Sequence, residues 1–281
     1  NEATALVDGD NAMGHLVMKR AAEIAIDKAA QRGIAWVGSR FSNHAGAAFP
    51  YAMMPLARDM IGLYVAVGSA NHMPPWGGSE SLLSTNPIAV AVPAHEEPPV
   101  ILDMATTMAS AGKVKTAARR GEKIPEGWMI DRQGRPITDP SRHGEGFLMP
   151  IGGYKGYGLA LIFGLLAGTL NGAAFGKGVI DFNKDMESVT NTGQFILAID
   201  IKAFADVEVF KRQVDGVVRQ MHGSPSLPGA DRVRVPGEHS HRVRAERAAQ
   251  GIPLHPDLLG DLEKLAGELG IKRLPGSKIS Q

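Results

Sequence analysis

An uncharged, glycine-rich run over residues 156–176 limits the folds open to this chain more than any other segment. Its length is enough for a helix to cross a bilayer. However, glycine recurs throughout the run, Asn171 lies inside it, and no aromatic belt borders it as at a membrane interface. We therefore expect a buried helix over residues 156–172 whose small residues permit close contacts, and no association with a membrane.

Helical and strand patterns alternate along the rest of the chain, which indicates an α/β or mixed α+β protein. Apolar periodicity predicts further helices over residues 16–32, 50–60, 104–120, 206–221, 240–250 and 256–269. Short apolar runs predict strands over residues 34–37, 61–67, 88–92, 100–103 and 195–201. Residues 68–87, 121–153 and 222–242 are rich in turn-forming residues. The first of these is a long loop, and loops of that length inside compact domains are usually functional.

The balance of charge argues against a nucleic-acid partner. Lys and Arg number 30 while Asp and Glu number 29, so no global basic field attracts a phosphate backbone. The chain has no cysteine, which excludes disulfides and cysteine-ligated zinc. It also has no HExxH or Walker A motif, and we expect no metal site. No signal peptide is visible, so we predict a cytoplasmic location.

The segment over residues 152–158, GGYKGYG, resembles a dinucleotide-binding fingerprint only loosely. Pro150 precedes it in place of a clear strand, and no acidic residue ends a second strand about twenty positions later. A doubly wound parallel sheet is therefore not supported. Lys155 lies among these glycines at a predicted helix start, where a phosphate group would be favourable. The alternative is an ordinary lysine in a loop.

His44 is the most suggestive single residue. It follows a predicted strand within a turn of small residues, SNHAG, which leaves room for a ligand. Imidazole titrates near neutral pH, so a histidine there suits general acid–base catalysis. The alternative is a turn histidine that only binds backbone groups.

Two further residues have open interpretations. Asp103 ends a predicted strand, where its carboxylate could bind a ribose hydroxyl, orient a catalytic partner, or simply cap the helix predicted from residue 104. Lys113 lies on that helix among other basic residues and could bind a substrate carboxylate. The alternative for Lys113 is a solvated basic face.

Nine segments in series resemble the malate/L-lactate dehydrogenase family, which lacks a Rossmann fold and includes ureidoglycolate and sulfolactate dehydrogenases, diketogulonate reductase and piperideine-carboxylate reductases. They are VDGDNAMG (7–14), SNHAG (42–46), PWGG (75–78), STNPIAVAVP (84–93), ILDMATTMASAGKV (101–114), EKIPEGWMID (122–131), PIGGYKGYGLAL (150–161), NTGQFILAID (191–200) and VPGE (235–238). The resemblance implies reversible hydride transfer between NAD(P)H and a small 2-oxo acid. No Rossmann-type residue discriminates NAD from NADP here, and we expect a slight preference for NAD.

The resemblance also implies a fold and an assembly. The expected fold is a mixed, largely antiparallel sheet with helices, together with a smaller helical domain. We expect a cofactor- and substrate-binding domain over residues 1–240, with a helical excursion over about 104–176. Residues 241–281 are expected to be a helical segment that packs with an N-terminal helical domain. Family members are typically homodimers or higher assemblies.

Site residues follow by resemblance. His44 matches the catalytic histidine of the family's SNH motif, and Lys113 favours a substrate bearing a carboxylate. Residues expected to bind the cofactor or line its pocket are Asn43, Ser69, Asn71, Thr85, Asn86, Asp103, Met104, Ala105, Lys155, Gly156, Asn191, Pro236, Gly237 and Glu238.

Several features depart from the family pattern. Family members have a Ser-His-Gly motif and an arginine upstream of VDGDN, and the given sequence begins after them, so we expect a fragment. Ser84 replaces the usual glycine before TNP, and Gln194 replaces a common histidine after NTG. Two other functions stay open: a cyclic imine reductase, and a non-catalytic nucleotide-binding or assembly protein. The particular 2-hydroxy acid is not identifiable from the sequence.

Overall fold

The computed structural model describes residues 1–271, which fall into two units. The first unit is Asn1–Gly237, and the second begins at Glu238. No helix within the described residues is long and apolar enough to span a membrane.

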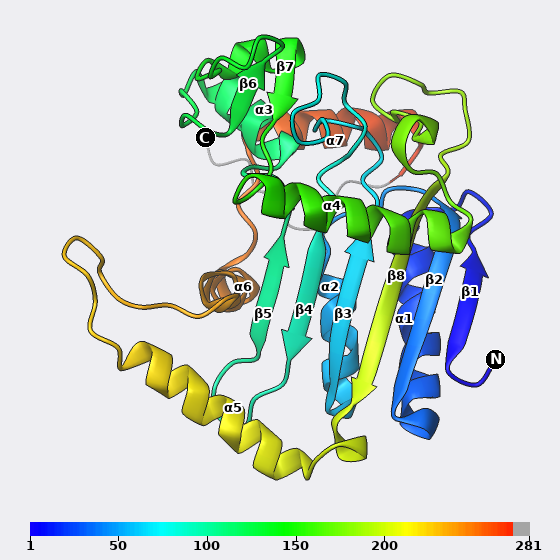
Figure 1. The fold of residues 1–281 in the computed structure, drawn as a ribbon, viewed down its shortest axis with the longest axis vertical. Helices are drawn as coiled ribbons and strands as arrows, with labels where there is room; N and C mark the ends of the chain where they lie inside the picture. Colours follow the sequence, from blue (N-terminus) through cyan, green and yellow to red (C-terminus); the bar gives the residue numbers. More distant parts are fainter. Residues whose placement is uncertain (272–281) are drawn as a thin grey trace. The chain divides into compact units, whose positions relative to one another are not determined.

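A six-stranded sheet is the centre of the first unit (Figure 1). Its spatial order is β1-β2-β8-β3-β4-β5, and only the β1–β2 pair is parallel. The expectation of a mixed, largely antiparallel sheet is therefore confirmed. The strands are β1 (Thr4–Asp8), β2 (Ile34–Ser42), β3 (Met60–Ala66), β4 (Ile88–Val92), β5 (Val100–Met104) and β8 (Thr192–Asp200).

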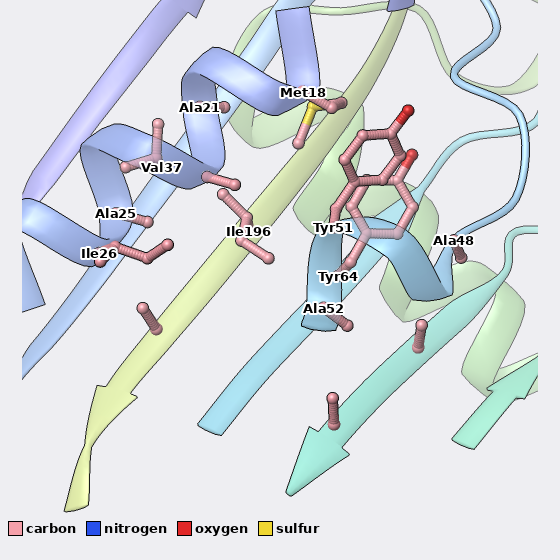
Figure 2. Packing of buried hydrophobic residues seen from close by; sticks show 14 of the residues in the cluster. Met18, Ala21, Ala25, Ile26, Val37, Ala48, Tyr51, Ala52, Tyr64 and Ile196 are labelled. Atoms are coloured by element: carbon pink, nitrogen blue, oxygen red, sulfur yellow. The ribbon is translucent and has the colours of Figure 1, made fainter. Parts of the chain in front are cut away.

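Both faces of this sheet are covered by helices because side chains along each central strand alternate between two apolar layers. Helices α1 (Gly14–Arg32) and α2 (Phe49–Met53) cover one face, where Tyr51 and Tyr64 pack at 5.1 Å between ring centroids (Figure 2). Helix α4 (Tyr154–Ala167) lies over the other, where Trp36 stacks on Phe195 at 3.8 Å.

Ile196 offers a test of the first layer. Its side chain is fully buried between β8 and α1 (Figure 2). Removing one methyl group in Ile196→Val should lower the free energy of unfolding by about 0.5–1.5 kcal/mol, because the cavity is only partly refilled. The matched variant Ile162→Val removes the same group from an exposed position on α4 and should change stability by less than about 0.5 kcal/mol. Equal losses in urea denaturation would contradict this packing.

A second, smaller apolar cluster is formed by residues that lie between β5 and α4 in the sequence. Helix α3 (Ala111–Arg120) packs against a two-stranded sheet of β6 (Met129–Asp131) and β7 (Gly146–Leu148). Farther along the chain, α5 (Val207–His222) binds the β4–β5 turn through Asp215, which accepts backbone hydrogen bonds from residues 95–97. The second unit contains α6 (Glu238–Gln250) and α7 (Pro256–Glu268).

Several predicted boundaries were wrong. The helix predicted over 104–120 begins only at Ala111, because residues up to Met104 pair with β4 and Ser110 caps the helix. The stretch over 121–153 contains the β6–β7 pair as well as turns. The expectation that α4 is wholly buried was also wrong. Its small residues, such as Gly156 and Ala160, are buried and its Phe163 and Leu166 pack against the sheet, while Ile162 is 52% exposed.

Candidate active site

One end of the six-stranded sheet gathers most of the predicted site segments. Pairing places the carboxyl ends of β2, β3 and β5 beside the amino ends of β8 and β4, as in the pairs Ser42–Thr192, Ala66–Gln194 and Ile88–Met104. The loops over residues 43–48, 67–87 and 105–110, together with the segment before β8, therefore begin or end at this edge (Figure 1).

The SNHAG turn is held by the segment that joins β1 to α1. Asn43 Nδ2 donates to the backbone oxygen of Asn11 at 2.7 Å and to its side-chain oxygen at 3.0 Å. A Cβ atom at Gly14 would lie 2.1 Å from the Asn43 carbonyl oxygen, so the start of α1 contacts this turn directly. The VDGDNAMG and SNHAG segments thus contact each other directly, and the Asn43 side chain has a structural role in joining them.

The His44 ring is fixed by two neighbours. The Gly46 N–H donates to His44 Nδ1 at 3.1 Å, and Phe182 stacks on the ring at 5.5 Å between centroids. Because Nδ1 acts as an acceptor, the neutral ring bears its proton on Nε2. Partial burial, followed by the charge of nearby His15, lowers the pKa of His44. His44 is therefore a neutral donor through Nε2 at neutral pH.

His15 was missed by the sequence analysis. A Cβ atom at Gly46 would lie 2.6 Å from His15 Nε2, so this imidazole rests on the SNHAG turn although it belongs to α1. Its position directly after the conspicuous DGDNAMG segment was the available signal.

Replacing His15 with glutamine should raise the pKa of His44. The substitution removes a titratable cation beside the ring, and a like charge disfavours the protonated form of its neighbour. The check is an NMR titration of the His44 imidazole protons in both proteins. The variant Lys19→Gln, one turn farther along α1, provides the control and should leave the His44 midpoint in place. A His44 midpoint that falls or stays unchanged in His15→Gln would contradict this coupling.

The segment over residues 181–183 connects three parts of the site. The Phe182 N–H donates to the Ser69 carbonyl at 3.2 Å while the Phe182 ring contacts His44. Asn183 Oδ1 lies 3.5 Å from Lys115 Nζ on α3. The loop after β3, the SNHAG turn and α3 therefore converge on one short segment.

Lys113 and Lys115 lie on different sides of α3, because two residues along a helix are about 200° apart. Lys115 is the one that reaches the 181–183 segment. For Lys113 the structure gives hydrogen bonds of the backbone N–H alone, to the Ser110 capping hydroxyl at 3.2 Å and to the Ser110 carbonyl at 3.1 Å. No side-chain contact links Lys113 to His44 within residues 1–271, and its carboxylate-binding role stays a prediction.

Four segments that carry the family resemblance meet beside the sheet. The Thr85 carbonyl accepts hydrogen bonds from the backbone and side chain of Thr106, and the Thr106 carbonyl accepts from Ile151 N–H. Farther along, a Cβ atom at Gly153 would lie 3.2 Å from the Trp76 ring. The TNP, DMATT, PWGG and GGYKGYG segments are therefore neighbours, as a shared binding role requires.

The GGYKGYG segment forms a glycine-dependent turn at the start of α4. Gly152 and Gly153 adopt positive φ values of 57° and 65°, which favour glycine. A Cβ atom at Gly156 would lie 2.2 Å from the Ile151 carbonyl oxygen, so the helix packs tightly on its own entry loop. Lys155 is exposed at the second position of α4, as its predicted role requires.

Two predicted cofactor residues also make structural contacts within the protein. The buried Asn86 side chain accepts from Gly68 N–H at 3.2 Å and donates to the Ala160 carbonyl at 2.8 Å. Asp103 accepts from Phe49 N–H at 3.1 Å, at the start of α2, and burial raises its pKa. The alternative that Asp103 caps the following helix was wrong, because Ser110 caps α3.

The remaining predicted residues of the first unit lie in the loops at this edge or beside β5. Asn71 donates to the Gly176 carbonyl at 2.8 Å, while the buried Asn191 Oδ1 has no hydrogen-bond partner among the described residues. The Pro236 carbonyl accepts from Ile101 N–H at 3.1 Å, and Gly237 approaches the same residue. Met104 ends β5 ahead of Ala105, and Glu238 begins α6.

Gln194 joins the buried sheet to the SNHAG turn. Its Oε1 accepts from the Ser39 hydroxyl at 2.6 Å, and its Nε2 lies 3.5 Å from the Asn43 carbonyl oxygen. The Asn171 amide donates to the Gln194 backbone carbonyl at 3.0 Å. The residue that departs from the family pattern is thus a paired, uncharged side chain beneath the candidate site.

Comparisons with known proteins agree with this geometry. A sequence model of malate/L-lactate dehydrogenase matches residues 1–263. L-sulfolactate dehydrogenase of Methanothermobacter thermautotrophicus is 38% identical over 270 residues, covering 96% of this chain and 76% of that protein. Ureidoglycolate dehydrogenase (NAD(+)) of Escherichia coli K12 is 33% identical over 256 residues, covering 91% and 72%.

Solved structures match equally broadly. Malate dehydrogenase from Entamoeba histolytica superposes with a TM-score of 0.92 at 27% identity, covering 98% of this chain and 79% of that one. The chain belongs to the malate/L-lactate dehydrogenase family. It is an oxidoreductase of the 2-hydroxy acid dehydrogenase class, as the resemblance implied, and the comparisons do not favour the imine reductase or the non-catalytic alternative.

Proposed function

We propose that this protein interconverts a small 2-oxo acid and its 2-hydroxy acid, with His44 as the donor to the substrate oxygen. The observation that supports this role is the Gly46 N–H bond to His44 Nδ1, which leaves the ring proton on Nε2. Hydride transfer builds negative charge on the carbonyl oxygen, and the fixed Nε2–H group stabilises that charge by a hydrogen bond. A proton from water then completes the hydroxyl group of the product. Stacking on Phe182 restricts the orientation of the donor.

The residues at this edge of the sheet fit a nicotinamide dinucleotide. Asn191 Oδ1 is a buried acceptor without a partner among the described residues, which a cofactor N–H or O–H group would satisfy. Lys155 and the backbone N–H groups at the start of α4 would bind the phosphates, with Gly152 and Gly153 permitting close approach. When bound, this cofactor supplies or accepts the hydride.

Further parts of the proposal are assigned by the resemblance. Ser69, Asn71, Thr85, Met104, Ala105 and the Pro236–Glu238 turn would line the cofactor site, and Asn86, Asp103 and Gly156 would shape it from behind. Lys113 would bind the substrate carboxylate. NAD as the preferred cofactor, a homodimer or higher assembly, and a cytoplasmic location remain predictions.

Cofactor binding provides the experiment. Titration of the full-length protein with NADH and with NADPH, followed by nicotinamide fluorescence, should give saturable binding of at least one, with NADH the tighter. A 2-hydroxy acid that competes with a 2-oxo acid in the presence of the cofactor would support the substrate class. Absence of binding by both dinucleotides would contradict the proposal. Turnover of a cyclic imine but of no 2-oxo acid would show that the protein is a cyclic imine reductase.

A further inference from the structure

A small cavity lies between α3, the β6–β7 pair and the loop that follows β3. Its volume is about 50 Å³, several times the roughly 10–15 Å³ needed to admit one water on the same measure. It is therefore large enough for a tetrahedral oxyanion. The lining residues are His72, Ala111, Val114, Lys115, Met129, His143, Gly146 and Leu148.

All three titratable side chains that line the cavity can bear positive charge. His72 is half-buried, and its ring makes no hydrogen bond to any residue from 1 to 271, although its backbone is held by Leu83 and Leu148. His143 Nδ1 donates to the Pro140 carbonyl at 3.0 Å, which leaves Nε2 free. Lys115 has only the 3.5 Å contact with Asn183 within that same range.

The one carboxylate near His72 in the described part of the chain is already paired. Asp181 Oδ1 accepts two hydrogen bonds from Asn183, each at 3.0 Å, and Asp181 Oδ2 lies 3.6 Å from Lys184 Nζ. Lys184 therefore balances Asp181, and the charge of Lys115 is left uncompensated beside His72 and His143. Among the described residues no three His, Asp or Glu side chains form a group that could hold a metal ion. An anion, not a cation, matches this set.

We propose that His72, Lys115 and His143 form a binding pocket for a sulfate- or phosphate-type oxyanion. A tetrahedral oxyanion accepts hydrogen bonds on every side, so it can bind a lysine ammonium and the N–H groups of two imidazole rings at once. Its binding would satisfy the His72 ring, which no described protein group satisfies. The pocket adjoins the candidate active site through residues 181–183 but rests on different residues from the hydride-transfer proposal, because neither His44 nor the GGYKGYG segment lines it.

Binding should strengthen as the pH falls. Burial lowers the pKa of His72; Lys115, Lys184 and His143 act in the same direction, and Asp181 acts against them. An oxyanion favours the imidazolium form and should raise the pKa of His72 when it binds. The affinity for sulfate, whose own charge is constant over this range, should therefore be higher at about pH 6 than at about pH 8.

Calorimetric titration of the full-length protein with sodium sulfate, at an ionic strength held constant with sodium chloride, tests the pocket. His72→Gln and Lys115→Met should each weaken sulfate binding about tenfold or more, because each removes a charge-assisted hydrogen bond. Lys115 is exposed, so its variant should fold even if His72→Gln does not. The controls are Lys123→Met, an exposed lysine just after α3, and His241→Gln on α6, which should bind sulfate like the wild type.

Competition identifies the source of the oxyanion. If sulfate weakens NADPH binding and not NADH binding, the pocket holds the 2′-phosphate of the cofactor. If sulfate binds and affects neither dinucleotide, the pocket takes a free oxyanion; both results support it. Absence of sulfate binding by the wild type, or unchanged affinity in either pocket variant, would overturn the pocket even if dinucleotide binding and turnover are normal.

Discussion

Replacing His44 with alanine should reduce kcat for 2-oxo acid reduction by about a hundred- to thousand-fold, the usual loss when one hydrogen-bond donor to a developing oxyanion is removed. The Nε2 proton of His44 is held in place by the Gly46 N–H bond and the Phe182 stack, so its loss leaves the substrate oxygen without this donor. Cofactor affinity should change little. Steady-state kinetics with both substrates varied, together with a fluorescence titration, separates the two effects.

The matched control is His95→Ala. His95 lies 3.1 Å from Glu208 of α5 and takes no part in the candidate site, so kcat should stay near the wild-type value. His44→Gln, which retains a side-chain N–H, should keep more activity than His44→Ala. A near wild-type kcat in His44→Ala would show that another group serves the substrate oxygen and that His44 only positions the turn.

Replacing Lys155 with methionine should raise the KM for the cofactor about 10- to 100-fold and lower kcat far less. A lysine that contacts a phosphate makes a charge-assisted hydrogen bond, and its loss weakens ground state and transition state alike. Methionine keeps most of the length of the side chain, so α4 and its glycine-rich entry turn should be unchanged.

Lys177 provides the comparison for Lys155. It follows α4 in the chain, is exposed, and pairs with Glu80 at 3.0 Å. Lys177→Met should leave the cofactor KM within about twofold of wild type, since a surface ion pair contributes little. If Lys155→Met leaves the cofactor KM unchanged as well, Lys155 is an ordinary surface lysine and the phosphates bind elsewhere.

Strands with strong apolar runs were predictable from the sequence, and those with weak local patterns were not. The run IAVAV coincides with β4 as predicted, because all of its residues are apolar and turn residues flank it. β1 is only five residues long, and its residues alternate between exposed and half-buried. It pairs with β2, which follows α1 in the sequence, so local sequence does not report the pairing. β6 and β7 are three residues long, too short for periodicity to register.

The site was predictable in its motifs and not in its contacts. The SNHAG and GGYKGYG segments mark His44 and Lys155 because small residues gathered at a turn leave space for a ligand to approach the backbone. The approach of Phe182 to His44, and the hydrogen bond of Asp103 to the start of α2, depend on contacts between distant segments. Local sequence has no period or spacing that reports such contacts, so these roles emerge only from the folded chain.

Isotope transfer tests the central proposal most directly. The full-length protein is supplied with a 2-oxo acid and with NADH or NADPH bearing deuterium at the transferable C4 position, and the product is examined by mass spectrometry and NMR. Our account predicts a 2-hydroxy acid with deuterium on C2 and none on oxygen after exchange with water. Oxidation of the labelled cofactor without deuterium at C2, or no transfer to any oxo acid by protein that binds the cofactor, would contradict it.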